Sequence, residues 1–170
     1  MQANTTLVAG TEDTLPDPGF LLPAPNSRRP AGWRLALHRG FKEAIRLTRA
    51  EVGLLHVCGE AFLFTVAVHG LDAGLHMHVG VSFWDDAMQH VLRGGAVLGT
   101  KGQGAEAGAV ARRLRASAIP DAVLAVPVLF AGQIEAVLEL GRHAKSFREG
   151  DDTVAMRAMR GSLQAVETTA

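Results

Sequence analysis

Three histidines lie close together in a glycine-rich part of the sequence and are the first candidates for chemistry. His76 and His78 stand two apart, and His69 lies just upstream. Imidazole nitrogens are common ligands of zinc and of haem iron, so an H-x-H loop could supply two ligands. The sequence contains no Cys-x-x-Cys or HExxH motif that would complete a recognisable site. We therefore expect ordinary loop and strand histidines, with no metal and no cofactor; metal or haem ligation is the alternative.

Cys58 is the one cysteine of the sequence and the next candidate. Enzymes that work by thiol–disulfide exchange need an attacking thiol and a second thiol that resolves the intermediate. A single subunit of this chain cannot supply both. We therefore expect Cys58 to be a small buried residue that contributes packing, and a redox enzyme built on it is the least favoured function.

The run from Gly99 to Gly108 is rich in glycine and contains Lys101. Phosphate-binding loops place glycines between a strand and a helix N-terminus, so that backbone N–H groups converge on the anion. The spacing here matches neither GxxxxGK[ST] nor GxGxxG, and Glu106 would repel an anion. We expect this run to be a lid over a pocket, with a nucleotide site as the alternative.

The composition argues against several classes of function. Lys and Arg number 17, as do Asp and Glu, so the net charge is zero and no general attraction to nucleic acid or anionic membrane is expected. No run is long and apolar enough to span a bilayer, and the N-terminus lacks the pattern of a secretory signal. The single cysteine fits a reducing compartment. We expect a cytoplasmic protein that binds no nucleic acid and does not insert into a membrane.

Residues 1–30 differ from the rest because they hold most of the prolines. Proline at this density prevents regular hydrogen-bonded structure, so we expect a flexible Pro-rich N-terminal arm followed by one domain over residues 31–170. The apolar run Phe20–Leu22 within the arm could act as a docking peptide. The prolines of the arm are Pro16, Pro18, Pro23, Pro25 and Pro30.

Hydrophobic periodicity predicts the elements that follow the arm. Ser82 is expected to be the N-cap of a short helix, and Pro120 to separate a later helix from a strand. The basic cluster at 112–115 is expected to face mostly solvent on that later helix. The predicted order is a helix over 31–49, strands over 52–57 and 61–69, a loop over 70–80, a short helix after 82, a strand over 96–98, a helix over 106–118, two strands, and a last helix from 150.

The two last strands form the most informative stretch, from Val123 to Asp152. They are joined by Ala131-Gly132, where Gly132 supplies the positive φ of a tight hairpin turn. In the second strand, the even positions from 134 to 140 share one apolar face. Pro127 cannot donate to a ladder, so it should mark a sheet edge or a bulge.

This stretch resembles the C-terminal half of a GAF domain. The matching features are Val126-Pro127, the Ala131-Gly132 turn, Leu138-Glu139-Leu140, and Phe147 four residues before Asp151. The predicted order of elements extends the resemblance over residues 31–168. It implies an α+β fold with a central antiparallel sheet of five to six strands. The first and last helices would lie on one face, and short helices would enclose a pocket on the other.

The resemblance also indicates where a ligand and a partner would bind. We expect a ligand to contact His78, Phe83, Trp84 and Met88, chosen by their position beside the implied pocket. Apolar residues on the first and last helices would form a dimer or partner interface, or equally the domain's own core. These residues are Trp33, Leu37, Met156, Met159, Leu163 and Val166.

No catalytic triad, metal motif or pair of carboxylates stands out, so the sequence predicts a non-enzymatic protein. The favoured function is that of a regulatory GAF-domain protein in signalling that binds a small molecule, a partner protein, or both. We expect a homodimer and a protein partner in the same pathway. The alternative is a ligand-free GAF-fold dimerisation or scaffold protein. A redox enzyme related to GAF-type methionine sulfoxide reductases is less favoured, because Cys58 stands alone.

Overall fold

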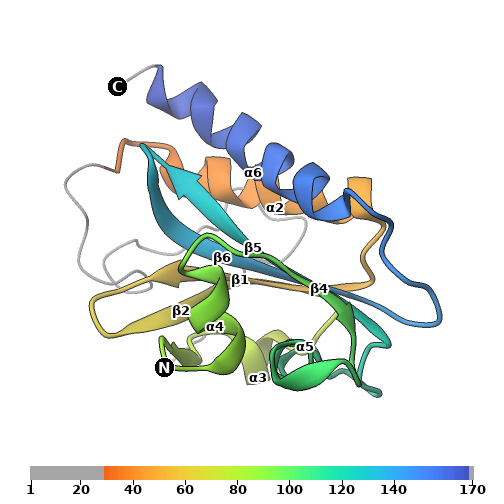
Figure 1. Cartoon of the computed structure of the whole chain (residues 1–170). Helices are drawn as coiled ribbons and strands as arrows, with labels where there is room; N and C mark the ends of the chain where they lie inside the picture. The colour runs from red at the N-terminus through yellow and green to blue at the C-terminus, as the bar shows by residue number, and fades with distance from the viewer. Residues whose placement is uncertain (1–28, 169–170) are drawn as a thin grey trace.

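A computed structural model describes residues 29–168, and in them one antiparallel sheet carries helices on both faces (Figure 1). The sheet has six strands in the order β3-β2-β1-β6-β5-β4. The strands are β1 (Val52–Cys58), β2 (Phe62–His69), β3 (Gly80–Ser82), β4 (Val97–Thr100), β5 (Ala122–Phe130) and β6 (Gln133–Arg142). The helices are α2 (Trp33–Thr48), α3 (Ala73–His76), α4 (Asp86–Val91), α5 (Gly104–Arg113) and α6 (Asp151–Glu167). The predicted α+β architecture is confirmed.

Helices α2 and α6 pack side by side on one face of the sheet (Figure 1). Gly40, in the middle of α2, permits this approach. A Cβ atom at this position would lie 3.1 Å from the Cα atom of Met159 on α6, closer than side chains normally approach. The glycine lowers the helix propensity of α2, but it lets the two helices come into close contact.

The apolar residues that face the sheet from α2 and α6 form the core of this layer. Trp33 and Leu37 are buried, as are Met159 and Leu163. Trp33 meets Phe130 of β5 edge to face, with ring centroids 6.5 Å apart. These four residues, expected at a dimer or partner interface or in the core, contribute their side chains to the domain's own core. Of the six, Met156 and Val166 are only partly buried.

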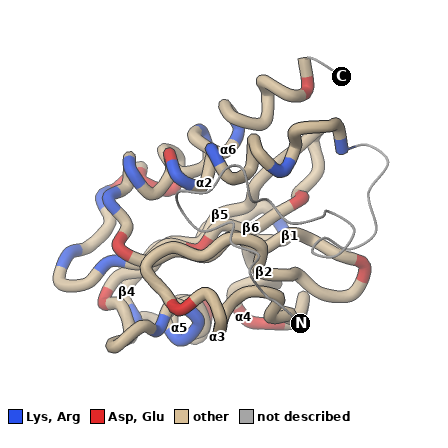
Figure 2. The backbone as a smooth tube through the Cα atoms, turned by 180° about the vertical axis from the view of Figure 1, so that it is seen from behind, with Lys and Arg blue, Asp and Glu red and all other residues tan. Residues whose placement is uncertain are grey.

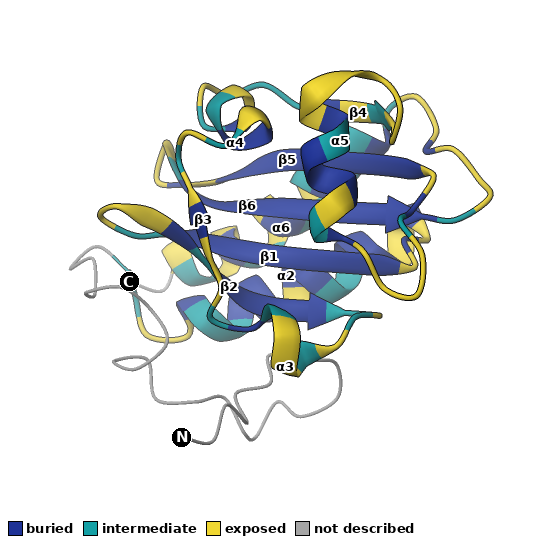
Figure 3. Ribbon diagram, turned by 90° about the horizontal axis from the view of Figure 1, so that it is seen from below, coloured by how far each residue is buried: buried dark blue, intermediate teal, exposed yellow. Residues whose placement is uncertain are grey.

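The opposite face of the sheet is covered by α3, α4 and α5 (Figure 3). A second apolar cluster fills the space between these short helices and the sheet. Met88 and Val91 of α4, with Val110 of α5 and Leu114 just after it, have no exposed surface. No water-sized cavity can therefore touch these four side chains.

The hairpin of β5 and β6 follows the sequence prediction closely. Ala131 and Gly132 both have positive φ, at 49° and 76°, as a two-residue type I′ turn requires. Pro127 lies beyond Ala125, the last β5 residue paired with β4, and the ladder shifts between Val128 and Leu129. Of the two predicted alternatives, Pro127 marks the edge, and the bulge lies just beyond it in the same strand. The predicted apolar face of β6 is also confirmed, because its even positions from 136 to 140 face α2 and α6.

Three local predictions are wrong. Ser82 ends β3 and caps no helix, because its hydroxyl accepts the Trp84 N–H in a tight local turn; Asp85 is the N-cap of α4. The expected loop over 70–80 contains α3, whose first turn is capped by Asp72. Helix α5 ends at Arg113, five residues early, and the chain leaves the helical hydrogen-bond pattern there, since the Ala116 N–H donates to the Ala118 carbonyl.

The N-terminal residues that the structure describes are held against the domain. Residues 1–28, including Phe20–Leu22, lie outside the described part. The Arg29 guanidinium lies 2.6 Å from the Glu135 carboxylate and 4.3 Å from the centre of the Trp33 ring. The last two residues assigned to the arm therefore belong to the packed domain. Within residues 29–168, no helix has the length and apolar character needed to cross a membrane.

Candidate functional site

An ion pair between Arg113 and Glu139 lies inside the molecule, on the sheet face covered by the short helices. Glu139 stands in β6 and is fully buried, and Arg113 is the last residue of α5. The Arg113 Nε atom lies 3.0 Å from both carboxylate oxygens, and Nη2 lies 2.5 Å from Oε1. This two-point geometry is the strongest form of a guanidinium–carboxylate contact. It fastens the C-terminal end of α5 to a central strand.

Asp85 connects this ion pair to α4. Its Oδ2 atom lies 2.5 Å from Arg113 Nη1. Its Oδ1 atom accepts the backbone N–H groups of Ala87 and Met88, at 3.0 and 3.3 Å, and so caps α4. Since one carboxylate performs both roles, any movement of Arg113 affects the first turn of α4.

His56 and Thr65 extend the cluster across the sheet. His56 Nε2 lies 2.9 Å from Glu139 Oε2, and His56 Nδ1 lies 3.0 Å from Thr65 Oγ1. The Thr65 hydroxyl donates to the Val79 carbonyl at 3.3 Å. Together Asp85, Arg113, Glu139, His56 and Thr65 form what we call the charged network. It runs from α4 and α5 through β6, β1 and β2 to the segment before β3.

The pKa values of the network follow from its burial and its pairing. Burial alone would raise the pKa of Glu139, but Arg113 and then His56 outweigh it and lower this pKa to about 2. Burial likewise opposes the charge of Arg113, while Glu139 and Asp85 raise the pKa of the guanidinium above its ordinary value. Both groups are therefore charged at neutral pH, and the buried Glu139 depends on Arg113 and His56 to stay ionised.

The network reaches the surface in an open depression of about 480 Å³ between β3 and α5, which we call the β3 depression. It is lined by residues 79–82, Trp84, Asp85 and Arg113. The side chains of Arg113 and Asp85 are 18% and 22% exposed, whereas Trp84 is 79% exposed. An indole face, a guanidinium and a carboxylate are thus offered to solvent together. This combination can bind a planar polar molecule.

The four residues expected to contact a ligand are not gathered around one cavity. Trp84 lines the β3 depression, but Met88 is fully buried under α4. Phe83 is half-buried and packs against the same apolar cluster. His78 is half-buried, has a left-handed backbone with φ of 64°, and donates its backbone N–H to Thr65. The interior part of the expected pocket is filled by side chains.

The other candidate residues are involved in local structure. Within residues 29–168, no three His, Cys, Asp or Glu side chains are close enough to hold a metal ion. Burial lowers the pKa of His69 and of His76. In the glycine-rich run, Lys101 pairs with Asp121 at 2.9 Å, which ties the turn after β4 to the residue before β5.

Cys58 is half-buried at the end of β1. Burial raises the pKa of its thiol to about 11, Glu135 adds to the effect, and Arg29 offsets part of it. The thiolate is the reactive form of cysteine. At neutral pH this thiol is therefore protonated and a poor nucleophile.

Sequence reasoning misses the charged network. It uses Glu139 only as part of the Leu138-Glu139-Leu140 match and expects Arg113, in the basic cluster at 112–115, to face mostly solvent. A signal is nevertheless present, because Glu139 shares its strand face with Val137 and His56 stands inside an apolar strand. Two ionisable residues on inward positions predict a pair, since neither can be buried alone at low cost.

Comparisons with known proteins bear on the fold that holds this network. A scan against protein-family models finds no match. A search of curated proteins finds none either. Among solved structures, a GAF domain/HD domain protein from Geobacter sulfurreducens matches with a TM-score of 0.63 and 12% identity, over 80% of this chain and 92% of the other. The second GAF domain of DevS from Mycobacterium smegmatis matches with a TM-score of 0.60 and 16% identity, over 81% and 94%.

This chain has the GAF fold. The resemblance predicted from the hairpin is confirmed. The same GAF-type arrangement matches a type II free methionine-R-sulfoxide reductase from Thermoplasma acidophilum, with a TM-score of 0.55 and 15% identity, over 80% of this chain and 95% of the other. The structural similarity establishes a shared fold. At sequence identities this low, the activity must be inferred from the residues of this chain.

Proposed function

We propose that this GAF-fold protein is a non-enzymatic regulatory module in signalling, which binds a small molecule in the β3 depression. One observation carries the proposal. The floor of the depression, Arg113 with Asp85, is the exposed end of a network that ties α4 and α5 to three central strands. A molecule that contacts Arg113 therefore acts on groups that hold several elements in place.

The charges around Arg113 define the chemistry of the ligand. The Arg113 guanidinium already binds two carboxylates, Asp85 and Glu139. An anionic group of a ligand can therefore bind Arg113 only by displacing Asp85. Glu139 is buried and cannot leave. Displacing Asp85 also removes the cap of α4, which costs about 1 kcal/mol of helix stability. We infer a ligand with a planar ring for Trp84 and an acidic group for Arg113, and a response carried by α4.

Two pKa values support a non-enzymatic role. A general acid or base works best when its pKa lies near the working pH, and Glu139, with a pKa of about 2, stays ionised in its ion pair. The Cys58 thiol, with a pKa of about 11, is protonated when it would need to attack. The reductase that shares this fold keeps a redox role as the less favoured alternative.

The second candidate function is a ligand-free scaffold. The filled interior beside Met88 and Val110 favours it. The face formed by α2 and α6 gives it less support, because basic residues lie along both helices (Figure 2). The exposed arginines are Arg39 and Arg46 on α2, and Arg157 and Arg160 on α6. A symmetric dimer through this face would bring like charges together. A homodimer, a protein partner and a cytoplasmic location remain parts of the proposal.

The emission of Trp84 tests the ligand. The other tryptophan, Trp33, is buried, so a molecule in the β3 depression would change the exposed Trp84 alone. We expect small molecules extracted from the native host to shift the emission to shorter wavelength, and native mass spectrometry to show the added mass. The Trp84→Phe variant is the control and should lose the shift. If the full chain shows neither a shift nor an added mass, the ligand-binding proposal is wrong and the scaffold is favoured.

A further inference from the structure

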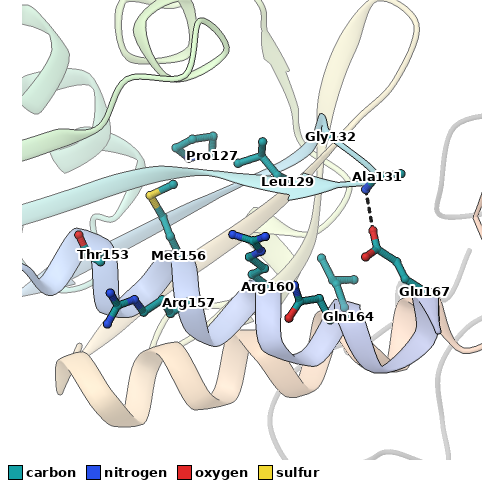
Figure 4. A pocket seen from close by; sticks show the side chains of 11 residues that line it. Pro127, Leu129, Ala131, Gly132, Thr153, Met156, Arg157, Arg160, Gln164 and Glu167 are labelled. Atoms are coloured by element: carbon teal, nitrogen blue, oxygen red, sulfur yellow. Dashed lines mark hydrogen bonds between the residues drawn. The ribbon is translucent and has the colours of Figure 1, made fainter.

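A groove of about 500 Å³ runs between α6 and the hairpin of β5 and β6, away from the β3 depression (Figure 4). Pro127 and Leu129 form its strand side, and Met156 and Arg160 form its helix side. Leu129 is 41% exposed, although it stands in a strand. Within residues 29–168, no strand pairs with β5 past Ala125 on the edge away from β6. The groove therefore lies beside an open strand edge and has an apolar floor.

The groove carries positive charge. Arg157 and Arg160 both line it, and neither forms a salt bridge with a residue in the range 29–168. The one acid in the lining, Glu167, accepts the backbone N–H of Ala131 at 2.7 Å and so closes the end near the hairpin turn (Figure 4). A chain that combines apolar residues with acids is the complement of this surface.

Residues 11–22, TEDTLPDPGFLL, form a segment with this composition, and they lie outside the described part. This segment holds Glu12, Asp13 and Asp17, no basic residue, and the apolar run Phe20–Leu22. Its order also fits the groove. Counted from the hairpin turn, the groove presents the apolar Leu129 first and the arginines later, and the segment, counted back from Arg29, presents Phe20–Leu22 first and the acids later.

The chain enters the domain at the right place. Arg29 is bound to Glu135, close to the hairpin turn that closes the groove, and Trp33 beside it touches Phe130. The seven residues from Leu22 to Arg29 can span up to about 23 Å. The groove follows α6 from Thr153 to Glu167, a length of about 21 Å. These lengths are compatible with a segment that leaves Arg29 and follows the groove along α6.

We propose that residues 11–22 dock in this groove of their own chain, with Phe20–Leu22 against Leu129 and the acids against Arg157 and Arg160. This inference is independent of the proposed ligand. Its consequence is that the segment covers an edge strand and a basic surface, both of which could otherwise receive another protein. A partner that needs this face must first displace the segment.

A paramagnetic label on the full chain tests the docking. Leu21→Cys is introduced in a Cys58→Ala background and carries a nitroxide, which broadens amide signals within its range. We expect the signals of Leu129, Ala131 and Arg160 to lose more than half of their intensity. The control variant carries the label at Glu60→Cys, in the exposed β1–β2 turn, and should leave these signals unchanged. If the label at position 21 leaves them intact, the docking proposal is wrong.

Charge reversal tests the arginines separately. Arg157→Glu with Arg160→Glu would repel the acids of the segment and should restore the intensities of Leu129 and Ala131 at least twofold. Both arginines are exposed, so the fold does not depend on them. Adding Glu12→Arg, Asp13→Arg and Asp17→Arg to this variant should bring the broadening back. Broadening that ignores both sets of changes overturns the charge match. Broadening seen only between separately labelled copies in a mixture overturns docking within one chain.

Discussion

Arg113 and Glu139 form a two-point ion pair in which the Glu139 side chain is fully buried and the Arg113 side chain is 18% exposed. The pair stands where apolar side chains fill the rest of the interface between the sheet and the short helices. It joins the last residue of α5 to β6, and through Asp85 it reaches α4. The stability of this half of the molecule and the proposed response to a ligand therefore rest on the same contact.

Removing the guanidinium should be costly. Arg113→Ala leaves Glu139 buried without its main partner, and we expect a loss of about 3–5 kcal/mol in the free energy of unfolding. Chemical denaturation of the full chain measures it. Arg112→Ala is the matched control, because Arg112 is exposed on the next position of the helix, and it should change stability by less than about 0.5 kcal/mol. Equal effects of the two variants would contradict the structure.

Removing both charges should be tolerated better than removing one. In the double variant Arg113→Met with Glu139→Met, no unpaired charge is buried, so we expect recovery of more than half of the loss caused by Arg113→Ala. The same denaturation experiment gives the comparison. A double variant as unstable as the sum of its single changes would show that the two side chains do not interact.

The free energy of unfolding should decrease in acid as Glu139 becomes protonated. Its pKa in the folded state, about 2, lies below its ordinary value of 4.5, so the stabilisation is complete above pH 4.5 and is lost as the pH falls toward 2. We expect the stability difference between the wild type and Glu139→Gln to shrink by about 3 kcal/mol over this window. Glu60→Gln, at an exposed site, is the control. A difference that stays constant with pH would contradict the low pKa.

Two glycines in helices should respond oppositely to alanine. Gly40→Ala brings a Cβ atom to 3.1 Å from the Met159 backbone, so we expect a less stable protein although alanine favours helix. At Gly161 on α6, a Cβ atom would meet no other atom within 4 Å, so Gly161→Ala should gain up to about 1 kcal/mol. Thermal unfolding compares the two. Stabilisation by both changes would show that α2 and α6 are not in close contact at Gly40.

Cys58 should react slowly in the native protein. Raising the thiol pKa from its ordinary value of 9.0 to about 11 reduces the thiolate fraction at neutral pH about a hundredfold. Alkylation by iodoacetamide, followed by mass spectrometry, should therefore be much slower before than after unfolding in denaturant. The native rate should keep rising with pH to about 11. Fast labelling of the native protein at neutral pH would restore the redox alternative.

Much of the fold can be predicted because its signals are local. The turn at Gly132, the edge at Pro127 and the alternation along β6 each depend on residues adjacent in the chain. The start of α4 is harder to place because Ser82 and Asp85 both suit a helix cap. The hydrogen bonds of the folded chain show that Ser82 accepts the Trp84 N–H and that Asp85 caps the helix.

The sequence by itself determined most of the order of the elements and their apolar faces, because hydrophobic periodicity and turn residues act over a few positions. The sheet covered on both faces was implied by the resemblance to GAF domains. Only the tertiary structure decided where the charges go. Arg113 and Glu139 are 26 residues apart in the chain, and His56 and Glu139 are 83 apart. Burying an ionisable group is costly unless a partner meets it, and the folded sheet with its short helices is what brings these partners together.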